Sequence, residues 1–208
     1  MNQPKQYFIT GIDTNVGKTI AAAVVTQALE ADYWKPVQAG DLNHSDSLKV
    51  KSLLSNNKSI LHPEAYQLNT PASPHYAAAV DNITIEKKKF VLPATNNHLV
   101  VEGAGGLFVP LNDHYLIIDL IQDLKIPVIL VVNFYLGSIN HTLSSIEALK
   151  SRSIPVAGLL FNGKITAASQ SYILQYSQLP NLGEIPTLPT LDAKNIAKQA
   201  AILRPKLL

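Results

Sequence analysis

Short apolar runs alternate with amphipathic stretches along most of this chain. Residues 126–133, IPVILVVN, form the clearest run, a continuous apolar segment typical of a strand buried on both faces. Similar runs predict further strands at residues 6–11, 33–37, 98–103, 154–162 and 181–186. Helical spacing between the strands predicts helices at residues 18–31, 137–152 and 192–203. Strand and helix therefore follow one another in regular alternation.

This alternation predicts an α/β fold with a doubly wound, mostly parallel sheet flanked by helices, because parallel neighbours need crossover connections. Residues 41–97 are less regular, and we expect them to be long connections with short helices over the sheet. The 208 residues are enough for one sizeable domain, so we expect residues 1–208 to form a single domain. Ligands of such sheets bind beyond the carboxyl ends of the strands.

Composition narrows the function. A net charge of +2 is too small to indicate a nucleic-acid or membrane-surface protein, and the basic run 87–89 is expected to be a solvated surface. The chain has no cysteine, which excludes disulfides, thiolate metal sites and a cysteine nucleophile. Its six histidines show no paired ligand spacing. No signal-peptide core or membrane-length segment is visible, so we expect a cytoplasmic protein.

The stretch GIDTNVGKT, residues 11–19, lies between the first strand and the first helix. Five residues separate Gly11 from Gly17, whereas the common phosphate-binding loop has four. Backbone amides at the start of the helix and the charge of Lys18 suit phosphate groups, and the Thr19 hydroxyl suits Mg²⁺. The order strand, loop, helix therefore predicts a P-loop NTPase-like fold with a nucleoside triphosphate site.

Three further residues are candidates for the same site. Glu102 closes a predicted strand, where a carboxylate is costly unless it meets a cation; the alternative is a solvent-facing loop residue. Asp46 is a second candidate Mg²⁺ ligand, and its alternative is a helix N-cap. Lys35 either faces an anionic ligand or extends to solvent from an edge strand.

Six motifs in the same order resemble those of the dethiobiotin synthetases, almost from end to end. They are GIDTNVGKT (11–19), KPVQAG (35–40), SPHYAA (73–78), VVEGAGG (100–106), LGSINHT (136–142) and LGEIP (182–186). The extra residue in the phosphate-binding loop is shared with that family.

The resemblance implies an ATP-dependent ligase of biotin biosynthesis. Such an enzyme converts 7,8-diaminopelargonate, CO2 and ATP to dethiobiotin, ADP and phosphate, with Mg²⁺, through a carbamate and a carbamic–phosphoric anhydride. The family is homodimeric, with the substrate site near the subunit interface. Lys35 and Lys18 would offset the repulsion between the anionic carbamate and phosphate groups.

The resemblance also assigns residues to roles. Lys35 and Lys18 are the implied catalytic lysines, and Thr19, Asp46 and Glu102 the implied Mg²⁺ ligands. The implied nucleotide contacts are Asn15, Val16, Gly17, Lys18, Thr19, Ile20, Asp46, Glu102, Gly103, Ala104, Gly105, Asn162, Pro186, Thr187 and Leu188, with Asn162 at the adenine. The implied substrate contacts are Lys35, Ser73, Gly105, Asn140 and Tyr172, of which Asn140 lies in the stretch that reaches the partner subunit's substrate.

Some positions depart from the family. Ala39 stands where a hydroxyl residue is usual, Gly163 where an aspartate is common and Tyr135 where a lysine is usual.

Other protein classes with related folds offer alternative functions. Partition and septum-placement ATPases carry an early loop lysine where Asp13 stands here, and cobyrinic-type amide synthetases need a fused glutaminase domain with a cysteine. A freestanding kinase would bind ATP without responding to a diamine acid.

Overall fold

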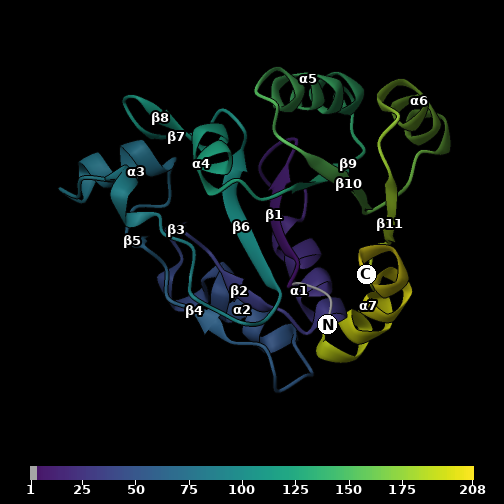
Figure 1. Ribbon diagram of the computed structural model, residues 1–208, viewed down its shortest axis with the longest axis horizontal. Helices are drawn as coiled ribbons and strands as arrows, with labels where there is room; N and C mark the ends of the chain where they lie inside the picture. The colour runs from purple at the N-terminus through teal and green to yellow at the C-terminus, as the bar shows by residue number, and fades with distance from the viewer. Residues whose placement is uncertain (1–3) are drawn as a thin grey trace.

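A seven-stranded parallel sheet forms the centre of the protein in the computed structural model, which describes residues 4–208 (Figure 1). Its strands are β1 (Gln6–Gly11), β2 (Asp32–Trp34), β4 (Leu61–His62), β6 (Leu99–Gly106), β9 (Val128–Asn133), β10 (Val156–Asn162) and β11 (Asn181–Ile185). Their order across the sheet is β11-β10-β9-β1-β6-β2-β4, and every pairing is parallel. The predicted doubly wound sheet is confirmed.

Helices cover both faces of the sheet (Figure 1). The helices are α1 (Lys18–Leu29), α2 (Asp46–Leu53), α3 (Pro74–Val80), α4 (Ile117–Leu124), α5 (Ser138–Ser151), α6 (Ala167–Ser177) and α7 (Ala193–Leu207), with 3₁₀ turns η1 (Leu42–His44) and η2 (Lys87–Lys89). One face carries α1, α2 and α7, and the other carries α4, α5 and α6. Phe8 and Ile9 of β1, residues 99–101 of β6 and residues 128–132 of β9 are fully buried between these layers, as their continuous apolar runs predict.

The predicted strand at 33–37 is wrong in its extent. The chain forms β2 to Trp34 and then a separate strand, β3 (Val37–Ala39), which pairs with β5 (Tyr66–Leu68). Pro36 has no N–H to donate to a sheet ladder, so the main strand ends before it. Lys35 consequently stands at the carboxyl end of β2 and not within a strand.

Residues 41–97 contain more regular structure than predicted. β4 joins the edge of the main sheet beside β2, and β5 belongs to the small second sheet.

Outside residues 41–97, the structure also contains elements that the sequence analysis did not predict. They are the helices α4 and α6 and the antiparallel pair β7 (Pro110–Asn112) and β8 (Tyr115–Leu116). The basic run 87–89 is exposed, with Lys87 paired to Asp123. No helix among residues 4–208 is long and apolar enough to cross a membrane.

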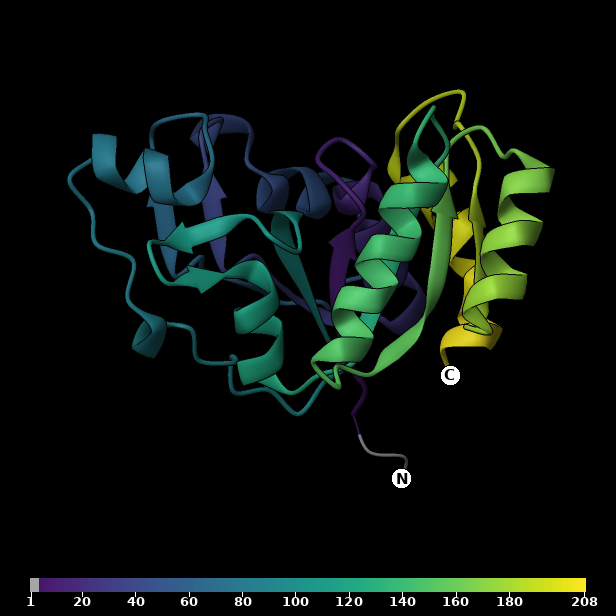
Figure 2. The ribbon, with the colours of Figure 1, turned by 90° about the horizontal axis from the view of Figure 1, so that it is seen from above.

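The order of strands places β1 at the centre, where the chain switches direction across the sheet. The connection through α1 leads to β2 on one side, whereas β9, β10 and β11 follow on the other. Figure 2 shows the loop after β1 rising from this central strand, at the opposite end from the N-terminus. Ligands of such sheets bind at this switch point, so the topology directs attention to the loop at 11–17.

Candidate active site

The loop after β1 is built to hold an anion at the start of α1. Asn15 and Gly17 have φ angles of 60° and 89°, and a Cβ on Gly17 would lie 2.0 Å from Asn162 Nδ2, so only glycine fits there. Gly17 caps α1 without any side-chain hydrogen bond, which leaves the first amides of the helix available. The Lys18 ammonium folds back and donates to the Asp13 carbonyl at 2.8 Å. These features are those of a phosphate-binding loop.

Lys18 is buried, as are Ile12 and Val16 of its loop. Burial and the nearby Lys35 ammonium together lower the pKa of Lys18 to about 8, against the opposing effect of the carboxylates around it. A buried cation without a counterion in contact is costly, and a bound phosphate would offset that cost. The loop is therefore suited to receive negative charge.

Thr19, Asp46 and Glu102 meet in one cluster although they are far apart in sequence. Thr19 Oγ1 lies 2.8 Å from Asp46 Oδ1 and 2.9 Å from Glu102 Oε1. Thr19 is in the first turn of α1, Asp46 begins α2 and Glu102 lies in β6, beside the strand that leads into the loop. The hydroxyl and the two carboxylates form an all-oxygen donor set next to the phosphate-binding loop.

Lys35 is the cation of this cluster. Its Nζ lies 2.6 Å from Asp46 Oδ2 and 3.1 Å from Glu102 Oε1, and it donates to the Gly103 carbonyl at 3.2 Å. Burial by itself lowers the pKa of Lys35, but Glu102 and Asp46 outweigh burial and raise it, so the side chain stays charged. The alternative of an edge-strand lysine reaching solvent is excluded, because Lys35 is buried and β2 is flanked by β4 and β6.

The alternatives for the two carboxylates are also resolved. Glu102 is 1% exposed, so it is not a solvent-facing loop residue. Asp46 is not the cap of α2, because Ser45 takes that position and its side chain accepts from the Leu48 amide. Burial raises the pKa of Asp46, but the Lys35 ammonium and the Thr19 hydroxyl outweigh burial and hold it below its usual range. Asp46 is thus an ionised partner of a cation and a hydroxyl, and Glu102 contacts the same two groups.

The cluster fits a magnesium ion bound together with phosphate oxygens. Within residues 4–208 no group of three or more His, Cys, Asp or Glu side chains is gathered for a metal, so a fully protein-coordinated site is not formed. Mg²⁺ usually takes one or two carboxylates, and substrate phosphates and water complete its octahedron. Asp46, Glu102 and the Thr19 hydroxyl match that requirement, and Lys35 already lies between both carboxylates as a cation would.

Loops from both sides of the sheet adjoin the phosphate-binding loop. Gly105 has a φ of 66°, and a Cβ there would lie 3.6 Å from Thr14 Oγ1, so the Gly103–Ala104–Gly105 stretch passes close to that loop. On the other side, Asn162 is buried and its Nδ2 donates to the Val16 carbonyl at 2.9 Å. Pro186, Thr187 and Leu188 follow β11, which the Gly163 amide ties to β10 by donating to the Ile185 carbonyl.

The predicted substrate contacts are less closely gathered. Ser73 caps α3 and lies 3.1 Å from His75 Nδ1 through its hydroxyl, and Asn140 is exposed in the first turn of α5. Tyr172 is half exposed on α6, where it stacks on Tyr176. No hydrogen bond among residues 4–208 joins these three to the Lys35 cluster.

Three residues near the cluster were missed by the sequence analysis. The Tyr33 hydroxyl donates to Glu102 Oε2 at 2.8 Å, and Gln38 Oε1 accepts from the Asp46 amide at 3.1 Å. Trp34 lies between Tyr33 and Lys35, buried, with its Nε1 donating to the Pro63 carbonyl. An aromatic residue in an apolar strand resembles any core residue, so the sequence carried no signal for the Tyr33 contact.

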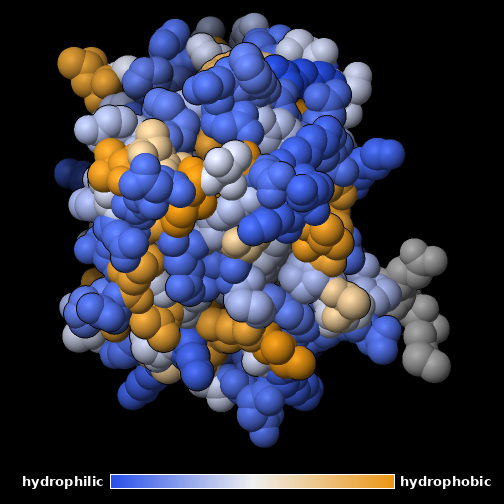
Figure 3. All heavy atoms as spheres, turned by 90° about the vertical axis from the view of Figure 1, so that its left-hand side faces the viewer, coloured by the Kyte–Doolittle hydropathy of each residue, from blue (hydrophilic) through white to orange (hydrophobic). Residues whose placement is uncertain are grey.

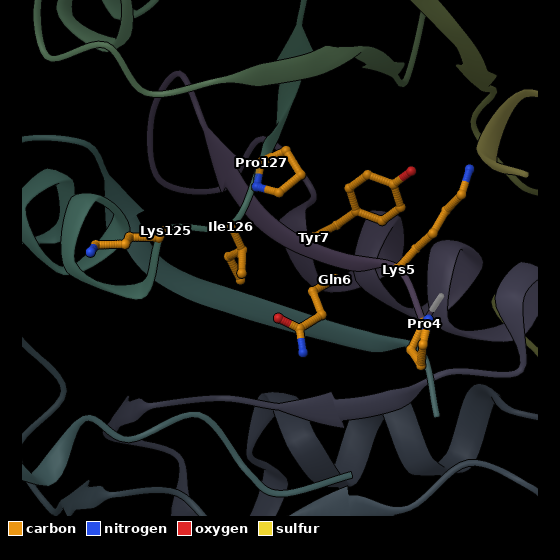
Figure 4. A pocket seen from close by; sticks show the side chains of 7 residues that line it. All are labelled: Pro4, Lys5, Gln6, Tyr7, Lys125, Ile126 and Pro127. Atoms are coloured by element: carbon orange, nitrogen blue, oxygen red, sulfur yellow. The ribbon is translucent and has the colours of Figure 1, made fainter. Parts of the chain in front are cut away.

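A hollow at the opposite end of the sheet is unrelated to this cluster (Figure 4). Its lining comes from the start of β1 and the turn before β9: Pro4, Lys5, Gln6, Tyr7, Lys125, Ile126 and Pro127. The polar ends of Lys5 and Tyr7 are engaged by the Leu207 carbonyl, at 2.9 and 3.3 Å. This hollow lies at the amino ends of the strands, where this fold does not bind ligands.

Comparison with known proteins agrees with this arrangement. A family model described as an AAA domain matches residues 5–195. A protein of Christiangramia forsetii named ATP-dependent dethiobiotin synthetase is 50% identical over 204 residues, which cover 98% of each chain. A protein of the same name from Rhodopseudomonas palustris strain HaA2 is 47% identical and covers 91% of this chain and 89% of its own.

Solved structures show the same fold at low sequence identity. The septum site-determining protein MinD of Pyrococcus horikoshii, complexed with Mg-ADP, matches with a TM-score of 0.61 at 12% identity, over 99% of this chain and 94% of its own. A ParA family ATPase of Chlorobium tepidum matches with a TM-score of 0.58 at 12% identity, over 96% and 98%. At such identity the likeness concerns the fold alone.

Proposed function

We propose, from the premise that this chain belongs to the family of ATP-dependent dethiobiotin synthetases, a reaction and a set of residue roles for its site. Membership makes the protein an ATP-dependent ligase of biotin biosynthesis with ATP as co-substrate. The proposed reaction joins 7,8-diaminopelargonate, CO2 and ATP to give dethiobiotin, ADP and phosphate. The observation that carries the proposal is the buried Lys35, whose ammonium contacts Asp46 and Glu102 beside the phosphate-binding loop.

The proposed chemistry has three steps. One amine of the substrate adds to CO2, forms a C–N bond and loses a proton, which gives a carbamate. A carbamate oxygen then attacks the γ-phosphorus of ATP, and the bond to the departing ADP breaks. The second amine attacks the carbon of this anhydride, closes the five-membered ureido ring, loses a proton and expels phosphate. No protein nucleophile is needed, so positioning and charge stabilisation remain as the work of the side chains.

The two lysines divide that work. Lys18, with the amides of residues 15–20, binds the phosphates of ATP. Lys35 points its ammonium at the anionic carbamate and reduces its repulsion with the γ-phosphate. Thr19, Asp46 and Glu102 would hold Mg²⁺, which supplies charge neutralisation for the phosphate oxygens. The direct contacts of Lys35 with both carboxylates support this grouping.

The remaining contacts follow from the family. Asn162, Pro186, Thr187 and Leu188 would surround the base, and Gly103 to Gly105 would approach the phosphates and the diamine. Ser73, Asn140 and Tyr172 would contact the substrate. The exposure of Asn140 and Tyr172 at the surface of one chain supports a homodimer in which the partner subunit completes the substrate site.

Exposed apolar side chains support the homodimer. Leu136, directly before α5, is fully exposed, and Phe108 after β6 is 60% exposed. On α3, Tyr76 and Val80 are both at least half exposed, and Figure 3 shows apolar patches on the face of the molecule at that side. Apolar surface of this kind commonly marks an interface. We further propose that residues 1–208 act as one catalytic unit in the cytoplasm.

An isotope experiment tests the function directly. Purified protein is incubated with MgATP, labelled bicarbonate and 7,8-diaminopelargonate, and acid-stable label in a ureido product is measured. Omission of the diamine should abolish both the product and the release of phosphate that accompanies it. Phosphate release that ignores the diamine would instead indicate a freestanding kinase or a switch-type ATPase.

A further inference from the structure

Tyr33 stands directly behind the carboxylate of Glu102. Its hydroxyl donates to Glu102 Oε2 at 2.8 Å, and its side chain is fully buried. The other carboxylate oxygen, Oε1, lies 2.9 Å from Thr19 Oγ1 and 3.1 Å from Lys35 Nζ. The two oxygens of Glu102 therefore have different partners. Oε2 contacts the Tyr33 phenol, whereas Oε1 contacts the Thr19 hydroxyl and the Lys35 ammonium.

Strand register explains how the phenol reaches this oxygen. β2 and β6 are parallel, and Tyr33 pairs with Val100, two residues before Glu102. Residues two apart on a strand share a face, so Tyr33 and Glu102 lie on the same side of the sheet. Two residues span about 6.6 Å along a strand, which is close to the length of a tyrosine side chain from Cα to the hydroxyl oxygen. A shorter residue at position 33 would not reach.

We infer that Tyr33 is a positioning residue: its hydroxyl fixes the rotamer of Glu102 so that Oε1 faces the Thr19 hydroxyl and the Mg²⁺ of the bound nucleotide. The inference rests on the proposed function, which assigns Glu102 as a metal ligand. Partners that orient metal ligands in this way commonly set metal affinity.

Asp46, the other proposed ligand, lacks this support. Its side chain is 31% exposed, and both of its oxygens contact groups of the cluster itself, Thr19 and Lys35. The neighbouring Gln38 holds only the Asp46 backbone amide. We therefore expect Glu102 to be the fixed ligand and Asp46 to be the adjustable one, with the fixed position set from behind by Tyr33.

The variant Tyr33→Phe removes only the hydroxyl and keeps the ring in the core. Binding of a fluorescent ATP analogue is measured across a Mg²⁺ titration and again in EDTA. We expect the Mg²⁺ concentration at half-saturation to rise about 10- to 100-fold, whereas binding in EDTA stays near that of the unaltered protein; the unpaired Glu102 oxygen should also lower the melting temperature. A core residue without a positioning role would change the melting temperature and not the Mg²⁺ midpoint.

Tyr7→Phe is the matched control, because the Tyr7 hydroxyl donates to the Leu207 carbonyl at the far end of the sheet. It should leave the Mg²⁺ midpoint unchanged. A folded Tyr33→Phe protein with an unaltered midpoint, or an equal shift in Tyr7→Phe, would overturn the role of Tyr33 alone. Loss of any Mg²⁺ dependence in the unaltered protein would overturn the proposed metal ligands as well, so the two failures are distinguishable.

Discussion

Two carboxylates in neighbouring strands, Glu102 and Asp32, are equally buried, each about 1% exposed, yet they have opposite surroundings. Asp32 begins β2 at the amino end of the sheet and accepts from the Thr95 hydroxyl, the Asn97 amide and the Ile60 backbone amide, with His62 at 3.2 Å. Glu102, at the carboxyl end, contacts the Lys35 ammonium, the hydroxyl of Thr19 in the first turn of α1, and the Tyr33 phenol.

The difference supports the proposal that Asp32 is a structural carboxylate and Glu102 a functional one. The donors around Asp32 come from two chain connections, 60–62 and 95–97, so the carboxylate fixes loops to the sheet. The groups around Glu102 include the buried Lys35 ammonium and the first turn of α1, the helix that follows the phosphate-binding loop. Burial alone therefore does not identify a site, whereas a buried lysine and an anion-binding loop beside the carboxylate point to one.

Replacement of Lys35 by alanine should have the largest effect. It removes the charge that faces the carbamate, so product formation from labelled bicarbonate should fall by about 10²- to 10³-fold. Binding of ATP with Mg²⁺ should remain measurable, because the metal can neutralise Asp46 and Glu102 in place of the ammonium. If activity survives, Lys35 is not the group that stabilises the reacting anion.

The Glu102→Gln substitution should have the next largest effect. The amide cannot replace a charged Mg²⁺ ligand, so the Mg²⁺ concentration needed for half-maximal ATP binding should rise about 10- to 100-fold. Asp32→Asn is the matched control at the other end of the strands, where the same exchange should leave the Mg²⁺ midpoint unchanged. Equal shifts in both variants would remove the distinction between the two carboxylates.

Asp32→Asn should instead lower the free energy of unfolding, by about 2 kcal/mol, because a charged acceptor of several hydrogen bonds is lost. Burial raises the pKa of Asp32, but its hydrogen bonds outweigh burial and lower it. A lowered pKa stabilises the fold above the unfolded value of about 3.9, and this stabilisation is lost as pH falls through the folded pKa. Urea unfolding should therefore show a variant deficit that narrows below about pH 4, and a deficit independent of pH would contradict the assignment.

The smallest effect concerns the charge of Lys18. Its pKa of about 8 in the free protein means that the ammonium is lost as pH rises through that value, while phosphate favours the charged form. ATP affinity should therefore be highest below pH 8 and fall by up to about tenfold for each pH unit above it, since binding then requires proton uptake. Lys18→Arg, which stays charged, should flatten the slope of affinity against pH even if its affinity is lower. A flat profile in the unaltered protein between pH 7 and 9 would contradict the prediction.

Sequence patterns predicted the parts of this protein that depend on local chemistry. The apolar run of β9 and the GKT at the start of α1 each determine their structure from adjacent residues, and parallel topology then brings Thr19 and Glu102 to one edge. The helix α4 was open to the same analysis, since its apolar positions follow a helical period, but it was overlooked.

Contacts that depend on register could not be predicted in this way. Tyr33 meets Glu102 only because β2 pairs with β6 at Val100, a relation between strands more than sixty residues apart. The separation of β2 from β3 also depended on Pro36: the prediction took it to shorten the strand but still extended the strand to residue 37, whereas β2 ends at Trp34. The Ser45 cap, which leaves Asp46 free for the cluster, was likewise hidden by two adjacent residues that are both good caps.

Trp34 gives this site its own spectroscopic reporter. It is the single tryptophan of the chain, it is buried, and its neighbours in sequence are Tyr33 and Lys35. Indole emission depends on the charges and polarity near the ring, so rearrangement of the Lys35 ammonium on nucleotide binding should alter the fluorescence without any attached label. Every other aromatic residue is tyrosine or phenylalanine, and excitation at the red edge of tryptophan absorption would therefore follow one position, at the end of β2 directly before Lys35 in the chain.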